Sequence, residues 1–191
     1  SGKGLINSGE LLPPCVLYQA ADFLIALKPA GLNTHAPSPF HGDGLFEILR
    51  AWQPDWSSLS IVHRLDKETS GLMVFGRTPL ANKSLTEQFA GRLVRKTYSF
   101  LSDRDLDSGA VEIRSFIRKK GSQFFSLERG EPSEEAHTVI ERVGKHGRYF
   151  MFKARPRTGK THQIRLHAAQ LGIPVLGDQT YGGTSHHQLC L

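Results

Sequence analysis

A polar loop between two apolar runs holds the side chains of this sequence that are best suited to catalysis. The loop spans residues 63–71 and reads HRLDKETSG, between apolar runs at residues 59–62 and 72–75. A turn between two strands needs little more than its final Ser70-Gly71. Within the loop, Arg64 and Lys67 flank Asp66 and would keep its carboxylate ionised, as a nucleophile or a general base requires. An isolated Asp more often caps a helix or forms a salt bridge, but the surplus of charge favours a catalytic Asp66.

Other chemistries have weaker support. The sequence contains no CxxC pair, and its nine histidines form no HExxH motif, so we expect no metal site. Residues 157–161 end in the letters GKT but lack the first glycine of a phosphate-binding P-loop. They still place backbone N–H groups at the start of an expected helix, where a phosphate could bind. The GxSxG elbow of a serine hydrolase is absent.

Charge is unevenly distributed along the chain. The net charge is +6, yet residues 1–60 hold three Lys or Arg against five Asp or Glu, and residues 61–191 hold 21 against 13. The densest part, residues 92–165, holds 17 basic and 9 acidic side chains. A basic second part predicts a polyanionic partner, for which a nucleic acid is the leading candidate.

Hydrophobic periodicity predicts the elements that must position these residues. Short apolar runs bounded by Gly, Pro or polar turns predict strands over residues 16–18, 23–27, 72–76, 93–101, 111–117, 123–127, 136–143 and 148–154. Helices are expected over residues 45–52, from Pro79 to the stop at Gly91, and over residues 161–171. Strands mostly follow one another directly, which predicts the α+β class, with a mixed, largely antiparallel sheet flanked by helices and loops.

Two of these helices carry more detailed predictions. Thr78 should cap the second helix, with an apolar stripe that includes Leu80. In the third helix, Ile164 should lie on the buried stripe, whereas His162 and Arg165 are three residues apart and should share a different face.

Length and composition indicate one globular domain. The 191 residues can bury a sizeable core, and no apolar run approaches the ~20 residues of a membrane span. Residues 1–15 are expected to form an irregular lead-in, and residues 16–191 the domain itself. No secretory signal is evident, and the two cysteines favour free thiols in a reducing compartment over a disulfide, so we expect a cytoplasmic protein.

Four segments of the chain, in order, resemble the RluA-type pseudouridine synthases. They span residues 16–183, and all four in register are far more specific than HRLD alone. They are an opening hairpin ending in KPAGL (28–32), HRLD followed by TSG (63–71), the KTY segment (96–98), and THQIRLH (161–167) followed by GIPVLGD (172–178) and YG (181–182). Lys160 stands where the family more often has Arg. Residues 1–15 are too short for the S4-type RNA-binding module of many relatives, and the chain stops soon after YG, so the expectation is either a compact member of the family or one from which a piece was trimmed at either end.

The resemblance implies a pseudouridine synthase domain that isomerises one uridine in structured RNA, ribosomal or transfer RNA, to pseudouridine. No redox change or energy input occurs, so no cofactor is implied. By resemblance Asp66 acts at the ribose, either as nucleophile or as base. Tyr98 stacks on the uracil and assists proton transfer, and Arg165 pairs with the Asp66 carboxylate and keeps it aimed.

The resemblance also implies the RNA-binding residues. A base inside folded RNA must be extruded before its sugar is reached, and the family's HRLD arginine, here Arg64, enters the vacated space. An ion pair from Arg64 to Asp66 is the alternative role. His63 either contacts a phosphate or completes the loop fold. Lys96, Lys160 and His162 are the other RNA-binding candidates.

Two alternatives from other classes stay open. The first is a non-catalytic RNA-binding module on the same fold, against which the presence of Asp66, Tyr98 and Arg165 argues. The second is a glycoside hydrolase, which usually needs two carboxylates at the sugar; the other segments offer only Asp178. We expect a monomeric enzyme with RNA as its partner and no membrane contact.

Overall fold

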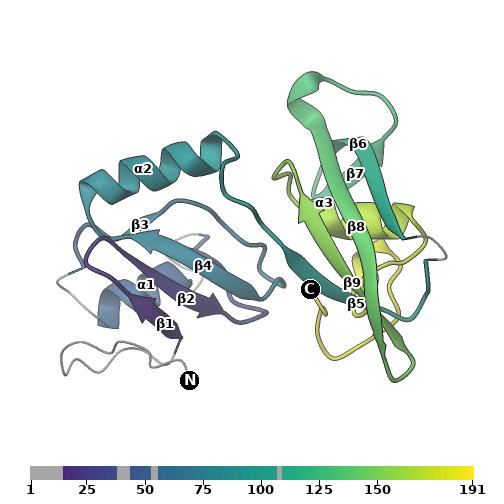
Figure 1. Cartoon of the computed structure of the whole chain (residues 1–191), viewed down its shortest axis with the longest axis horizontal. Coiled ribbons are helices and arrows are strands. Elements are labelled where there is room, and N and C mark those ends of the chain that lie inside the picture. The colour runs from purple at the N-terminus through teal and green to yellow at the C-terminus, as the bar shows by residue number, and fades with distance from the viewer. Residues whose placement is uncertain (1–14, 38–43, 53–55, 107–108) are drawn as a thin grey trace.

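The chain folds into two antiparallel β-sheets with three helices, and Figure 1 shows the two sheets as separate halves joined by the segment after α2. The computed structural model describes residues 15–37, 44–52, 56–106 and 109–191. The predicted lead-in, residues 1–15, therefore lies outside the described part of the chain except for Cys15. Within the described part, no helix has the length and apolar character needed to cross a membrane.

The first half is a four-stranded sheet in the order β1-β2-β4-β3, with helices α1 and α2. Its elements are β1 (Val16–Gln19), β2 (Phe23–Lys28), α1 (Leu45–Trp52), β3 (Ser60–Ile61), β4 (Gly71–Gly76) and α2 (Pro79–Ala90). Strand register sets the core, because Leu24 lies opposite Phe75 and Ala26 opposite Met73 on the same inner face. Leu45 and Leu49 of α1 belong to that core, along with Trp56 and Leu59.

Helix α2 begins and ends as its sequence predicts but packs less closely than expected. The Thr78 hydroxyl accepts the N–H of Ala81, Pro79 is the first helical residue, and Gly91 follows the last. No residue of α2 is buried, and Leu80 is 78% exposed, so the predicted apolar stripe does not cover a core. The helix leads the chain from the first half towards the second.

The second half is a five-stranded sheet in the order β5-β9-β8-β6-β7, with α3 against one face. Its elements are β5 (Tyr98–Ser102), β6 (Ala110–Lys120), β7 (Gln123–Leu127), η1 (Pro132–Glu134), β8 (Glu135–His146), β9 (Tyr149–Pro156), α3 (Gln163–Gln170) and η2 (Gln179–Tyr181). The hairpin of β8 and β9 is present where the sequence predicts it. Phe100, Ile140 and Phe152 of the sheet share a core with Ile164 and Ala168 of α3.

The α+β class is confirmed, with a difference in how the strands are divided. The structure has two sheets where one mixed sheet was predicted, and every described strand pair is antiparallel. Residues 93–97 were expected to be strand, but β5 starts only at Tyr98, so the preceding residues are left as a linker between the halves. Periodicity along one strand does not specify its partner, which is why the division was not predictable.

Candidate active site

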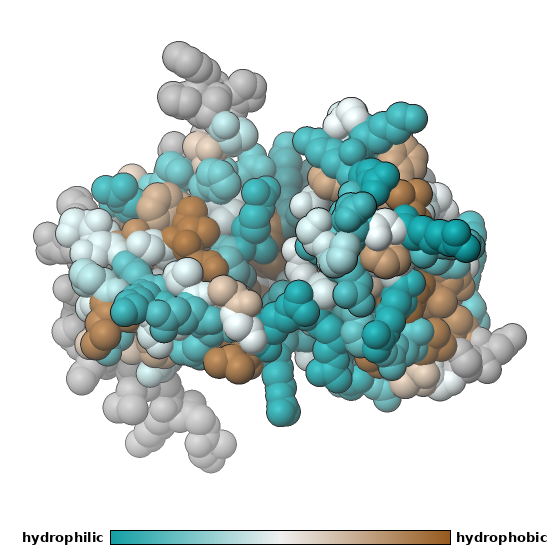
Figure 2. Space-filling view, turned by 90° about the horizontal axis from the view of Figure 1, so that it is seen from above, coloured by the Kyte–Doolittle hydropathy of each residue, from teal (hydrophilic) through white to brown (hydrophobic). Residues whose placement is uncertain are grey.

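A cleft of about 1110 Å³ lies between the two halves. It is lined by residues of the HRLDKETSG loop (63–71, the motif loop), of the linker before β5 (93–97) and of the segment that leads into α3. Figure 2 shows this face from above, with hydrophilic side chains on both sides of the hollow between the halves. The three predicted catalytic residues, Asp66, Tyr98 and Arg165, all line it. Segments almost 100 residues apart in the sequence therefore meet at one place.

The motif loop is fixed in place by Lys28, whose side chain has no exposed surface. The Nζ atom of Lys28 donates to the carbonyl oxygens of Lys67 at 3.0 Å, Leu32 at 2.7 Å and Pro29 at 3.1 Å. These three bonds satisfy all of its N–H groups. Burial lowers the pKa of Lys28 to about 8, although the negative charges of Glu68 and Asp66 act to raise it. The loop backbone on the carboxyl side of Asp66 is thus fixed to the end of β2.

A buried threonine fixes the other side of the same loop. The Thr34 hydroxyl donates to the carbonyl oxygen of Leu65 at 2.9 Å and accepts the Leu65 N–H at 3.1 Å. Asp66 therefore sits between two anchored residues, Leu65 and Lys67, and its own carbonyl accepts the Thr69 N–H at 3.1 Å. The backbone at Asp66 is held in place without any contact to its carboxylate.

The Asp66 carboxylate lies where the second half reaches it with a backbone donor. Its Oδ2 atom accepts the N–H of His162 at 3.3 Å, at the start of α3, where the helix dipole favours a negative charge. Arg64 is exposed in the cleft and, among the residues described, has no ion-pair partner. The alternative role for Arg64, an ion pair to Asp66, is therefore not realised in this structure.

Arg165 is buried, and its partner is not the one predicted. Its Nε and Nη2 atoms each donate to an oxygen of the Asp178 carboxylate at 2.7 Å, and the side chains are 7% and 0% exposed. The expected pair with Asp66 is corrected to a bidentate pair with Asp178, because the guanidinium needs a planar carboxylate beside it once buried. Burial lowers the pKa of Arg165, but the hydrogen bonds and charge of Asp178 reverse this, and the charge of Asp66 acts in the same direction.

The expected separate face for Arg165 and His162 is also corrected. Arg165 lies on the buried side of α3, where all the described residues from Gln163 to Ala168 are buried. His162 is not helical: it has φ of 57° and ψ of 16°, in the left-handed region, and α3 begins only at Gln163. The helix is short and enclosed, so it has no solvent face of the expected kind.

Tyr98 joins the two halves at the cleft. It is the first residue of β5, and its ring packs against the cores of both halves. Burial raises the pKa of Tyr98, and the negative charge of Asp66 raises it further. The phenol is therefore protonated at neutral pH, beside the carboxylate, where it can donate a proton or a hydrogen bond.

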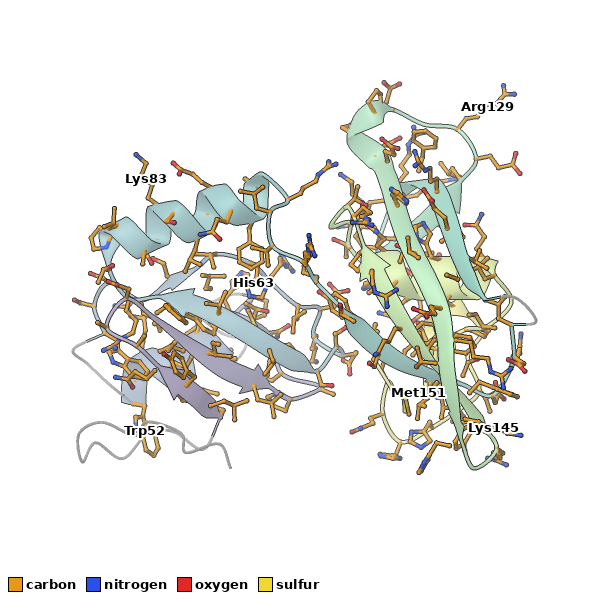
Figure 3. The ribbon with its side chains drawn as sticks, viewed as in Figure 1. Trp52, His63, Lys83, Arg129, Lys145 and Met151 are labelled. Atoms are coloured by element: carbon orange, nitrogen blue, oxygen red, sulfur yellow. The ribbon has the colours of Figure 1, made fainter. Side chains whose placement is uncertain are left out.

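His63 completes the loop fold rather than facing a phosphate. Its Nε2 atom accepts the N–H of Val74 at 3.0 Å, and its ring stacks on Phe89 with centroids 4.4 Å apart. Figure 3 shows it between α2 and β4. It contacts β4 on the side that faces β3, where the pairing of β3 with β4 has ended at Ile61. Burial, followed by the charge of Lys96, lowers the pKa of His63 to about 4. The structure therefore favours the second of the two roles considered for His63.

The remaining RNA-binding candidates lie on the cleft walls. Lys96 is half-buried in the linker, and Lys160 lies in the segment before α3, where its Nζ donates to the carbonyl of Ser133. Burial, and then the nearby charge of Arg92, lower the pKa of Lys96. The cleft has more basic side chains than those predicted; the additional ones are Arg92, Arg95, Arg155 and Arg157. The described residues include no group of three His, Cys, Asp or Glu placed to hold a metal.

Sequence reasoning missed the residue that organises the cleft wall. Gln163 accepts from the Thr158 hydroxyl at 2.7 Å and from the Lys160 N–H at 3.0 Å. It donates to the His137 carbonyl at 3.0 Å and to the Thr138 hydroxyl at 2.9 Å. All four of its hydrogen bonds are used, which ties the residues before α3 to β8. Its place in the letters THQIR was the only sequence signal.

A buried histidine extends this network below the helix. His167 has no exposed surface and contacts the Thr138 hydroxyl through Nδ1 at 2.7 Å and the Ser115 hydroxyl through Nε2 at 2.9 Å. Burial, followed by the charge of His137, lowers the pKa of His167 to about 4. The ring is therefore neutral in the folded protein at physiological pH.

Acid should destabilise the protein through His63 and His167. Both have a pKa of about 4 when folded and about 6.5 when unfolded, so the unfolded chain binds more protons between these values. Their contribution to stability is complete above pH 6.5 and is lost as the pH falls towards 4. Each histidine should change the free energy of unfolding by up to about 1.4 kcal/mol per pH unit in that window. Urea denaturation at several pH values measures this.

The matched comparison is His167→Gln against His187→Gln. The first substitution should remove about one histidine's share of the pH slope, whereas His187 is exposed and its replacement controls for the loss of a histidine as such. Equal slopes in both variants and the wild type would contradict the assignment.

Comparison with known proteins now adds to this geometry. Residues 22–170 match the family model described as RNA pseudouridylate synthase. The chain is 36% identical over 185 residues to an uncharacterized RNA pseudouridine synthase of Aquifex aeolicus, covering 91% of this chain and 57% of that protein. It is 33% identical over 175 residues to the ribosomal large subunit pseudouridine synthase C of Vibrio cholerae, covering 90% and 54%.

A third relative and a solved structure agree with these matches. The ribosomal large subunit pseudouridine synthase D of Pseudomonas aeruginosa is 35% identical over 175 residues, covering 88% of this chain and 53% of that protein. The chain thus spans about half the length of the curated relatives it matches. The solved structure of human RNA pseudouridylate synthase domain containing 1 superposes with a TM-score of 0.77 over 97% of this chain and 78% of that one, at 23% identity, a likeness of fold.

Proposed function

The chain belongs to the RNA pseudouridylate synthase family, and we propose that it isomerises a uridine in structured RNA to pseudouridine with Asp66 as its catalytic carboxylate. The observation that carries the proposal is the position of Asp66. It lies on an anchored loop in a basic cleft, with a backbone N–H of the second half on its Oδ2 atom. A non-catalytic RNA-binding module would not need a carboxylate fixed at the centre of a surface meant for phosphates.

The reaction balances without any added reagent. The bond from the anomeric carbon to N1 of uracil breaks, the base turns, and a bond forms from the same carbon to C5. The proton on C5 leaves, and N1 gains one. Asp66 acts at the sugar, either by adding to the anomeric carbon or by removing the neighbouring ribose proton. Oxidation states and group count are unchanged overall, so the chain's own residues suffice.

Other residues of the cleft have roles that fit this sequence of steps. Tyr98 is protonated beside Asp66, so it can stack on the uracil and donate a hydrogen bond, or the proton that N1 gains, but it is not the base that takes the C5 proton. Arg64 lines the cleft without an ion-pair partner among the described residues, and its planar guanidinium can stack in the space that an extruded base leaves behind. Lys96 and Lys160 both line the cleft, where they can contact phosphates. Arg165 supports the site through its charge rather than by a direct pair with Asp66.

The names of the relatives favour ribosomal RNA over transfer RNA as the substrate. We propose that residues 16–191 form the catalytic domain, that it works in the cytoplasm, and that it acts as a monomer, since the described site is complete within one chain. Light scattering with and without RNA measures the molar mass of the particle and so tests the proposed monomer.

The proposal is tested by mapping pseudouridines in RNA from cells that lack the protein. At least one uridine should lose its modification, and the wild-type gene should restore it. The position that is lost names the substrate and separates ribosomal from transfer RNA. An unchanged map in the deletion strain, together with no activity of the purified protein on total RNA, would contradict the proposed function.

RNA binding should weaken steeply with salt. A cleft that neutralises about five phosphates should lose roughly 10²–10³ in affinity between 50 and 200 mM salt. Arg157 lines the cleft and, in the described part of the chain, has no ion-pair partner, so Arg157→Ala should lower the slope of log Kd against log salt by about one. Filter binding or fluorescence anisotropy measures this. Lys83→Ala is the control, because Lys83 points away from the sheet in Figure 3; an affinity indifferent to salt would count against RNA.

A further inference from the structure

Backbone conformation singles out two residues of the cleft. Nine described residues have positive φ; seven are glycines, and the two others are Arg92 at 58° and His162 at 57°. Both line the cleft, one in the linker and one at the start of α3. The left-handed region is unfavourable for residues with a Cβ atom, and such residues persist where the surrounding structure or a function requires them.

At His162 the left-handed backbone has an identifiable consequence. A residue before a helix usually has an extended backbone, and its side chain caps the helix. The side chain of His162 makes no capping bond, while its carbonyl still accepts the Leu166 N–H at 2.9 Å and begins α3. Its own N–H is directed out of the helix and donates to Oδ2 of Asp66 at 3.3 Å. This is the only hydrogen bond to the Asp66 carboxylate among the described residues.

The imidazole of His162 is engaged elsewhere. Its Nδ1 atom lies 2.7 Å from the Tyr181 hydroxyl, and its ring packs against Phe124 with centroids 5.1 Å apart. The guanidinium carbon of Arg165 in turn lies 5.0 Å from the centroid of the Tyr181 ring, over its face. Burial and the charge of Arg165 lower the pKa of His162, which favours the neutral ring. The ring thus holds the residue in place, and its Nδ1 is not available to a phosphate.

We propose that His162 is a positioning residue for Asp66, which it orients through its main-chain N–H, rather than an RNA-binding residue that acts through its imidazole. With Oδ2 held by this donor, Oδ1 has no hydrogen-bond partner among the described residues and is directed to the ribose. The inference rests on the proposed function of Asp66. The proposed role depends on the left-handed backbone conformation of residue 162. Residues that tolerate this conformation, such as Gly and Asn, should therefore replace His162 better than Ala does.

The test compares His162→Gly, His162→Asn and His162→Ala. Gly and Asn adopt the left-handed region readily, whereas Ala does not. All three variants lose the ring contact to Tyr181, so single-turnover rates at saturating RNA should fall in each of them, and about five- to thirtyfold further for Ala than for Gly and Asn. The Kd for RNA should stay within about twofold in all three. This order reverses the usual expectation that Ala is the mildest replacement.

The outcomes separate this inference from the proposed function. A wild-type protein without activity on any RNA would overturn the proposed function. An active wild type with Ala as fast as Gly and Asn, or with Gly and Asn as slow as Ala, would overturn the inference alone. A tenfold loss of RNA affinity in all three variants would restore the phosphate role of the imidazole.

A measurement without turnover tests the contact directly. The amide proton of His162 should shift in the NMR spectrum of Asp66→Asn by more than those of Thr161 and Gln163, because it loses a charged acceptor. The measurement does not depend on whether His162→Ala folds. An amide resonance of His162 that does not respond to Asp66→Asn would overturn the proposed contact.

Discussion

Asp66→Asn is expected to abolish pseudouridine formation, lowering the single-turnover rate by roughly 10³-fold or more while leaving the Kd for RNA within about twofold. The amide has the shape of the carboxylate and can still accept the His162 N–H, so the loop should keep its conformation. It has no negative charge, however, and can neither add to the anomeric carbon nor remove a ribose proton. The measurement is pseudouridine formation in RNA from the deletion strain, with the purified variant or by complementation.

The matched control for this prediction lies two residues away. Glu68 is an exposed carboxylate of the same loop, and Glu68→Gln changes the charge of the loop by the same amount. It should retain activity within about threefold. If Asp66→Asn restored the modification as well as the wild type, Asp66 would not be the catalytic residue.

How far the sequence predicts this site depends on the kind of information that each residue carries. The role of Asp66 was predicted from its charged neighbours and from the family motif, because both are local. Lys28 could not be recognised in the same way: in the sequence it is an ordinary basic residue after a strand, and only the fold reveals that it has no exposed surface and binds three carbonyls. Its role depends on the carbonyl of Lys67, 39 residues along the chain.

The face and the partner of Arg165 were predicted wrongly for the same reason, because both depend on contacts distant in the sequence. Spacing along a helix indicated which residues share a face, and it placed Arg165 away from the core. The structure encloses α3 on nearly every side, so a charged residue became buried and required a partner. That partner, Asp178, lies in a segment whose backbone has no regular period, and neither propensity nor pattern could bring it to the helix. Elements were predictable to within a few residues, whereas pairing between them was not.

Asp178→Asn should destabilise the protein by about 3–5 kcal/mol, since it leaves the buried guanidinium of Arg165 without a counter-charge. For a chain of this size the melting temperature should fall by roughly 6–20 °C. The Tyr181 N–H also donates to Asp178, and Tyr181 contacts His162, so the damage should reach the support of Asp66. Denaturant unfolding and single-turnover rates measure the two effects. Arg114→Gln is the control, because that ion pair with Glu112 is more than half exposed and should contribute little to stability.

Replacing both members of the buried pair separates stability from catalysis. Arg165→Met combined with Asp178→Leu leaves no charge unpaired, and such replacements often restore the stability that a single substitution removes. The double variant should therefore be more stable than Asp178→Asn and yet remain slow, because the positive charge that acts on Asp66 is gone. Recovery of both properties would show that Arg165 has only a structural role. A double variant as unstable as Asp178→Asn would mean instead that the geometry of the pair, rather than its unbalanced charge, holds the end of α3 in place.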